Sequence, residues 1–257
     1  MRKTRKVRLP RADQLGRVGL AGRLSSAAVL LILTAAIVFG LVVRIEDRDR
    51  AAAEAATAVA GPSTMTKDGL VRVGSPDAKV VVTVVEDPQC PLCRSFESAT
   101  GPALDALVAK NAVSVDYDLV AIRDRSSTTA YSSRAANAGA CVAAADIGKW
   151  PVWRRELLNQ VPAEGSPGPS DQDLIDLAAR IGITPTPQLT DCVTTHRYRA
   201  YVANQTEKAI AAKLTHAPAV RIGTSPVTNL TPEGIDAAVR AATARQVEQS
   251  NPKSEVK

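Results

Sequence analysis

Aromatic residues are scarce in this sequence and make up 3% of its 257 residues. The interior of a folded domain must therefore be filled by Val, Leu, Ile and Ala, whose spacing alternates along the chain between strand-like and helix-like. That alternation predicts an α/β fold. The length exceeds that of a usual single domain but is short for two large ones, which favours one sizeable core with appendages. Internal repeats and a glycine-rich phosphate loop are both missing.

The chain after residue 23 has almost no net charge, although the formal net charge of the whole sequence is +6. Residues 1–23 hold eight basic residues against one acidic residue, a charge of +7 that leaves −1 for everything after them. A near-neutral body argues against a nucleic-acid footprint. Basic residues in short flanking segments are retained on the cytoplasmic side of a membrane, so residues 1–23 are predicted to form a basic cytoplasmic tail.

One long uncharged run follows that tail, the segment LSSAAVLLILTAAIVFGLVV at residues 24–43. As a helix it would measure about 30 Å, the thickness of a bilayer core, so we expect a single transmembrane signal anchor. Signal peptides have a shorter apolar run of about 7–15 residues with a cleavage site close behind it. The nearest such site, Ala58-Val-Ala60, lies well beyond the run. A cleaved signal and a buried helix are the alternatives.

The expected anchor determines the predicted localisation. It makes the chain a single-pass protein of the cell membrane, with residues 44–257 outside the cytoplasm in the periplasm or cell-wall space. Disulfides form and persist in that compartment. The chain has four cysteines, Cys90, Cys93, Cys141 and Cys192. An even number favours disulfides, while zinc binding stays open as an alternative.

The remaining sequence divides into segments by composition. Residues 44–66 are Ala-rich, then Gly-Pro-Ser, and are predicted to be a linker. Residues 67–245 are predicted to form the folded domain, with a helical insert at about 128–213. The tail at 246–257 is predicted to be disordered. The predicted order of elements is strand, helix, strand, helical insert, strand pair and helix, with strands near 80–85, 112–122 and 219–222.

The segment EDPQCPLCRSFE, residues 86–97, carries the clearest chemistry. It follows a buried apolar strand and opens a helix, where unpaired backbone N–H groups and the helix dipole stabilise an anion. Cys90 is therefore predicted to be a nucleophilic thiolate. Pro91 suits the first helical turn because it has no N–H to lose. Cys93, one turn further on and less exposed, could then attack a mixed disulfide at Cys90.

The longer stretch GSPDAKVVVTVVEDPQCPLCRSFE resembles the active-site region of DsbA-like thiol oxidoreductases of the thioredoxin superfamily, of the membrane-anchored bacterial type. The likeness extends from about Leu70 to Ala242. It implies a thioredoxin-like fold with an inserted helical domain, preceded by the transmembrane helix. It also implies an enzyme that introduces disulfide bonds into exported proteins, without cofactor or metal, and that is reoxidised by a membrane enzyme of the DsbB or vitamin K epoxide reductase type.

The resemblance also assigns residues outside the cysteine motif. A cis-proline facing the cysteines is expected at Pro218, with Ala217 beside it in the substrate groove; Pro185 and Pro187 compete for that role but precede the last helices of the insert. The resemblance implies a structural disulfide between Cys141 and Cys192.

Two positions leave questions open. Many family members have histidine where this chain has Leu92, and leucine cannot donate a hydrogen bond to Cys90, so a reductase or isomerase is an alternative function. Glu86 is either a buried acid that relays the proton of Cys93 or a solvated strand-end carboxylate. A non-catalytic thioredoxin-like binding module at the membrane is the alternative from another class. The two histidines, His196 and His216, lack a metal-ligand spacing and are expected at peripheral positions.

Overall fold

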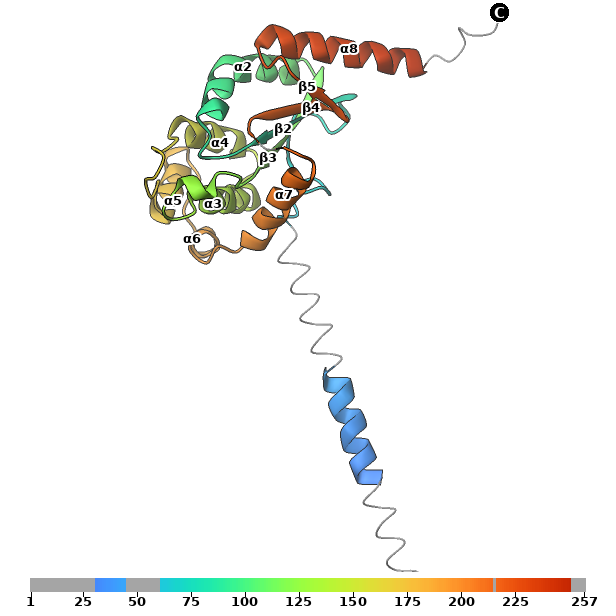
Figure 1. Ribbon diagram of the computed structural model, residues 1–257, viewed down its shortest axis with the longest axis vertical. Helices are drawn as coiled ribbons and strands as arrows, with labels where there is room; N and C mark the ends of the chain where they lie inside the picture. The colour runs from blue at the N-terminus through green and yellow to red at the C-terminus, as the bar shows by residue number, and fades with distance from the viewer. Residues whose placement is uncertain (1–30, 45–60, 215, 251–257) are drawn as a thin grey trace, which may run out of the picture. The chain divides into compact units, whose positions relative to one another are not determined.

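The computed structural model describes residues 31–44, 61–214 and 216–250 (Figure 1). The helix at residues 31–44 belongs to a unit separate from residues 55–257. The larger unit contains β1 (Val71–Val73), β2 (Val80–Glu86), α2 (Pro91–Ala109), β3 (Val113–Leu119), η1 (Asp124–Ser126), α3 (Tyr131–Ala145), α4 (Trp150–Asn159), α5 (Asp171–Arg180), α6 (Pro187–Thr194), α7 (Arg199–Ala211), β4 (Ala219–Ile222), β5 (Ser225–Val227) and α8 (Pro232–Ser250).

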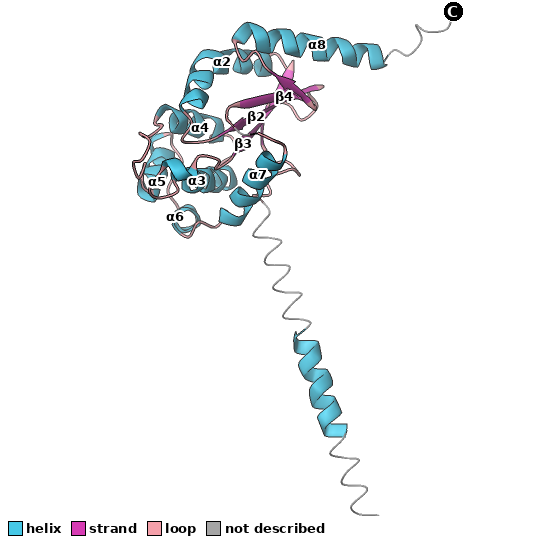
Figure 2. Ribbon diagram, viewed as in Figure 1, coloured by secondary structure: helices cyan, strands magenta, loops and turns pink. Residues whose placement is uncertain are grey.

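A five-stranded mixed sheet with the order β1-β3-β2-β4-β5 forms the centre of the domain (Figure 2). The central strand β2 pairs in parallel with β3, so that Glu86 lies opposite Leu119, and antiparallel with β4, so that Val85 lies opposite Ala219. Strands covered on both faces are apolar without alternation, which explains the run VVVTVVE of β2. The register places the end of β2, which leads to the cysteines, beside the start of β4.

Helices cover the sheet and form the insert. In the larger unit, α2 and α8 pack against each other, and α8 also contacts β2, β4 and β5, whereas α7 packs on β3 (Figure 1). The insert at 128–213, all of which the structure describes, contains helices and turns but no strand. Its helices pack mainly on one another, with α3 in contact with α4, α5, α6 and α7. One buried cluster runs from the sheet into the insert, so both share a core.

Two elements differ from the expectation. The short strand β1, antiparallel to β3, was not predicted, because three residues give too little alternation to read and its pairing depends on tertiary contacts. Helix α8 continues to Ser250, so residues 246–250, assigned from sequence to a disordered tail, are helical. Residues 251–257 lie outside the described residues.

The predicted membrane anchor is wrong. Residues 31–44 form a helix, while residues 24–30 of the predicted span lie outside the described residues. Among the described residues, every helix is too short or too polar to cross a membrane. The single-pass placement in the cell membrane, which depended on that anchor, is corrected with it.

Candidate active site

Cys90 is the N-cap residue of α2. Its backbone is extended, with φ −97° and ψ 110°, and its Sγ accepts the backbone N–H of Cys93 at 3.0 Å. Pro91 occupies the first turn, where its fixed φ suits the helix and its missing N–H costs no hydrogen bond. A side chain at this position accepts from N–H groups that the helix leaves unpaired, and a sulfur anion gains more from them than a thiol does.

The loop before β4 closes the other side of Cys90. The thiol of Cys90 donates to the carbonyl oxygen of Ala217 at 3.1 Å, and the bond between Ala217 and Pro218 is cis. Leu158 of α4 belongs to one buried cluster with both cysteines and Ala217. These contacts leave Cys90 only 3% exposed, more buried than the sequence suggests, whereas Leu92 is 63% exposed. Leu92, together with Pro91, is thus exposed to solvent, whereas both cysteines are buried.

The two thiols have opposite pKa shifts. Hydrogen bonding from the Cys93 side chain is the main cause that lowers the pKa of Cys90, and the backbone N–H groups of Cys93 and Leu92 act in the same direction. Burial and the carboxylate of Asp87 oppose that change. The pKa of Cys93 is raised, first by burial, then by the Cys90 side chain and by Glu86. The arrangement therefore favours a thiolate at Cys90 and a protonated thiol at Cys93.

Asp87 holds the loop that leads into the motif. One of its carboxylate oxygens accepts the backbone N–H of Gln89 at 2.8 Å and the hydroxyl of Ser132 at 2.6 Å. The other accepts the backbone N–H of Arg123 at 2.8 Å. Asp87 is buried, and burial raises its pKa against the effect of these donors. The side chain ties the cysteine loop to α3 and was not singled out from the sequence.

Glu86, the last residue of β2, is buried and ion-paired. Nη1 of Arg154 donates to its two carboxylate oxygens at 2.9 and 2.7 Å. Burial raises the pKa of Glu86 to about 7, although Arg154 opposes the rise. A solvated strand-end carboxylate is therefore not what the structure shows. A carboxyl group with this pKa can hold or release a proton near neutral pH.

Glu97 and Arg154 complete this buried network. Nη2 of Arg154 donates to Glu97 Oε2 at 2.6 Å, and Arg155 donates to Glu97 Oε1 at 2.9 Å. Burial alone would raise the pKa of Glu97, but the two arginines outweigh it and lower the pKa. A Cβ at Gly101, one turn further along α2, would lie 2.8 Å from Glu97 Oε1, so glycine leaves room for this carboxylate. Sequence reasoning missed Arg154 because its partners are distant in the chain.

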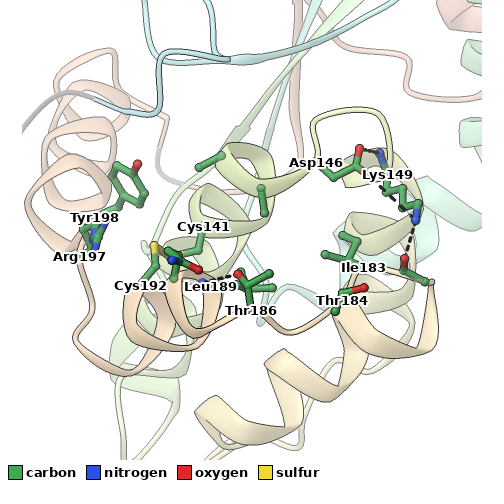
Figure 3. A pocket seen from close by; sticks show the side chains of 14 residues that line it. Cys141, Asp146, Lys149, Ile183, Thr184, Thr186, Leu189, Cys192, Arg197 and Tyr198 are labelled. Atoms are coloured by element: carbon green, nitrogen blue, oxygen red, sulfur yellow. Dashed lines mark hydrogen bonds and ion pairs between the residues drawn. A yellow bond between two sulfur atoms is a disulfide. The ribbon is translucent and has the colours of Figure 1, made fainter.

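Cys141 of α3 and Cys192 of α6 form a disulfide with a Cα–Cα distance of 5.9 Å, the pairing that the family resemblance implies. The bridge borders a pocket of about 430 Å³ that Asp146, Lys149 and Arg197 also line (Figure 3). Lys149 Nζ donates to the carbonyl of Gly182, which also lines that pocket. Cys90 and Cys93 are free thiols. The bridge thus crosslinks the insert at a place separate from the cysteine motif.

The other residues considered from the sequence lie outside the cysteine site. Pro185 and Pro187 are exposed at the start of α6, and their peptide bonds are not among the cis bonds of the described residues. His196 contacts Asp171 at 2.9 Å, and His216 is exposed. Within the described part of the chain, His, Cys, Asp and Glu side chains form no group of three or more that could hold a metal ion.

Comparisons with known proteins agree with this geometry. A family model described as thioredoxin matches residues 66–241. The structure is similar to the reduced disulfide bond oxidoreductase DsbG from Mycobacterium tuberculosis, with 32% identity, a TM-score of 0.60, and coverage of 69% of this chain and 89% of that chain. For reduced DsbA from the same organism the identity is 31%, the TM-score 0.58, and the coverage 68% and 92%.

A third structure supports the fold only. Oxidised BdbD from Bacillus subtilis is 19% identical, with a TM-score of 0.60 and coverage of 72% of this chain and 97% of that chain. A comparison with curated protein sequences finds no match. The chain belongs to the thioredoxin family and is a thiol–disulfide oxidoreductase of the DsbA type. The thioredoxin-like α/β part of the predicted fold and the predicted enzyme class are thereby confirmed, whereas the predicted membrane-spanning helix is wrong.

Proposed function

We propose that this oxidoreductase introduces disulfide bonds into exported proteins through Cys90 and Cys93. The observation that carries the proposal is the position of Cys90 Sγ at the start of α2, 3.0 Å from the backbone nitrogen of Cys93 that donates to it. The thiolate that this donor stabilises is a good leaving group in disulfide exchange. A pair whose reduced form is stabilised in this way is a strong oxidant.

The reaction proceeds in two exchanges. A substrate thiolate attacks Cys90 Sγ in the Cys90–Cys93 disulfide; the new bond joins substrate and Cys90, and Cys93 leaves as a thiolate that takes up a proton. A second substrate thiolate then attacks the substrate sulfur of this mixed disulfide. The substrate leaves oxidised, Cys90 leaves as a thiolate, and the enzyme holds both electrons in its reduced pair.

We assign the proton transfer at Cys93 to Glu86. Its carboxyl group is buried beside the motif, contributes to the raised pKa of Cys93, and has a pKa of about 7. As Cys93 leaves the disulfide, protonated Glu86 can supply the proton; when the pair is reoxidised, the carboxylate can take it back. Matching the pKa of the donor to the working pH makes transfer efficient in both directions.

Ala217, Pro218 and Leu92 are proposed to receive the substrate. The Ala217 carbonyl lies 3.1 Å from Cys90 Sγ, so an extended chain that pairs with this backbone would bring its own sulfur to Cys90. The exposed side chain of Leu92 offers an apolar contact beside that path. The reduced pair then needs an electron acceptor, for which we propose a membrane reoxidase of the DsbB or vitamin K epoxide reductase type, on the family resemblance.

The proposal is tested by oxidation of a reduced peptide that contains two thiols. The oxidised full-length protein is expected to yield the peptide disulfide and its own reduced pair. Cys90→Ser should abolish the reaction. In Cys93→Ser, no second thiol of the motif can resolve a mixed disulfide at Cys90, so this variant should trap mixed disulfides once its Cys90 thiol has been activated. The Cys141→Ser/Cys192→Ser variant serves as the matched control and should react normally. Peptide oxidation that survives Cys90→Ser would refute the role of Cys90.

A reductase or isomerase is the second candidate, and two observations favour it. Leu92 brings no donor or positive charge to Cys90, and the Asp87 carboxylate raises the pKa of Cys90. Both weaken the thiolate and make the disulfide less oxidising. A reduction potential near that of thioredoxin, about −270 mV, would support this candidate over the oxidase.

A further inference from the structure

The guanidinium of Arg154 lies where three elements meet, and the reaction described above does not use it. It is carried by α4 of the insert and bonds Glu86 at the end of β2 and Glu97 on α2. Its side chain is 2% exposed, and those of Glu86 and Glu97 are 0% and 4% exposed. Burying a charge costs free energy unless the charge is paired. The position of one cation between two buried carboxylates therefore points to a structural or chemical role.

The helix registers place this network next to Cys93. On α2, Glu97 follows Cys93 by four residues, and on α4, Leu158 follows Arg154 by four residues. Side chains four residues apart share one face of a helix, separated by about one turn of 5.4 Å. Leu158 shares a buried cluster with Cys93, and Arg154 bonds Glu97. The guanidinium therefore bonds a carboxylate that lies one helical turn beyond the buried thiol on α2.

We propose that Arg154 is a positioning residue that, by pairing with the Glu86 carboxylate, controls the transfer of the proton to and from Cys93. The inference rests on the relay role proposed above for Glu86. When the disulfide is reduced, the Glu86 carboxyl gives its proton to the departing Cys93 sulfur and becomes a carboxylate. Arg154 stabilises that carboxylate. In the reverse step, the Cys93 thiol returns its proton to Glu86 as its sulfur attacks a mixed disulfide at Cys90.

The groups facing Glu86 explain why Arg154 is needed. From α2 come Glu97 and Cys93, and from α4 comes Arg154. The centroid of the Tyr117 ring of β3 lies 4.0 Å from the guanidinium carbon. Burial and Glu97 both disfavour a charged Glu86, and Arg154 opposes them. Without the guanidinium, Glu86 would keep its proton at neutral pH. It could then no longer act as the base for Cys93.

The test uses the full-length protein with glutathione bound to Cys90 in a mixed disulfide. The rate of glutathione release, measured across pH, reports how fast Cys93 resolves that disulfide. The wild-type rate should show an inflection near the Glu86 pKa of about 7. Arg154→Met should move it upward by about one to three pH units. Arg155→Met is the matched control: Arg155 contacts Glu97 and Asp105 but not Glu86, so the inflection should stay in place.

Combination with Glu86→Gln separates an action through Glu86 from a general structural effect. Glu86→Gln should remove the inflection, and Arg154→Met should then change the rate no further, because residues acting through one group are not additive. Arg154→Lys is the second variant, in case Arg154→Met does not fold. Its ammonium cannot pair with both carboxylates as a fork, so it should shift the inflection in the same direction, and only while Glu86 is present.

Two results would overturn the inference while leaving the relay role of Glu86 in place. One is an inflection that stays at its wild-type pH in every folded Arg154 variant. The other is the same rate change from the Arg154 substitution whether Glu86 is present or replaced by glutamine. A wild-type profile in Glu86→Gln would remove the relay and this inference together, yet leave the oxidase proposal standing, since peptide oxidation through Cys90 tests that proposal separately.

Discussion

The pH dependence of folding provides a test of the buried carboxyl at Glu86. Its pKa rises from 4.5 to about 7 on folding, chiefly through burial. The folded protein thus binds the proton more tightly than the unfolded chain, and this stabilisation is fully present below pH 4.5 and is lost as the pH rises through about 7. At 1.36 kcal/mol per pKa unit, the loss amounts to about 3 kcal/mol.

Urea unfolding of the wild type and of Glu86→Gln across this pH range measures the effect. The amide of the substituted side chain does not titrate, so the difference in unfolding free energy between the two proteins should fall by about 3 kcal/mol from low to high pH. The comparison is needed because Asp118, whose burial raises its pKa to about 6, adds a similar slope to both proteins. Parallel curves for wild type and variant would refute the environment that we assign to Glu86.

Three further predictions concern the surrounding residues. Cys93→Ala should raise the pKa of Cys90, because the Cys93 thiol is the largest cause that lowers it; thiolate absorbance across pH measures this, and an unchanged titration would contradict the assignment. Leu158→Ala, which opens a cavity beside both cysteines, should reduce the unfolding free energy by about 2–5 kcal/mol, whereas Ile210→Ala on the exposed face of α7 should change it by less than about 0.5 kcal/mol. Equal losses in the two variants would argue against that packing. Cys141→Ser/Cys192→Ser removes a crosslink with a sequence separation of 51, so it should lower the unfolding free energy, measured by heat or urea, by about 4 kcal/mol. Peptide oxidation by the folded variant should persist. A loss of activity in the folded state would mean that the bridge takes part in exchange.

The sequence predicts the local part of the site well, because its chemistry depends on neighbours in the chain. A strand of β-branched residues that leads into Cys90, followed by Pro91, is enough to predict a thiol at a helix start, where the structure has it. The α/β frame and the helical character of the insert follow in the same way from hydrophobic spacing.

The sequence alone does not predict which side chains pair when they lie far apart in the chain. Arg154 is 68 positions from Glu86 and 57 from Glu97, and nothing in WPVWRRELLN distinguishes the buried arginine from the half-exposed Arg155 beside it. The burial of Cys90 likewise depends on Ala217 and Leu158, which the fold brings together. The anchor prediction used the length of the uncharged run at residues 24–43 and the charges that flank it, and no helix of the described residues bears it out.

The reduction potential of the Cys90–Cys93 pair tests the central claim most directly. The full-length protein is equilibrated in glutathione buffers, and the fraction of oxidised pair is read after acid quench and alkylation. The account predicts a potential well above the roughly −270 mV of thioredoxin, together with a lowered Cys90 pKa. A potential at or below that of thioredoxin, with an ordinary thiol pKa at Cys90, would contradict the oxidase mechanism and favour a reductase.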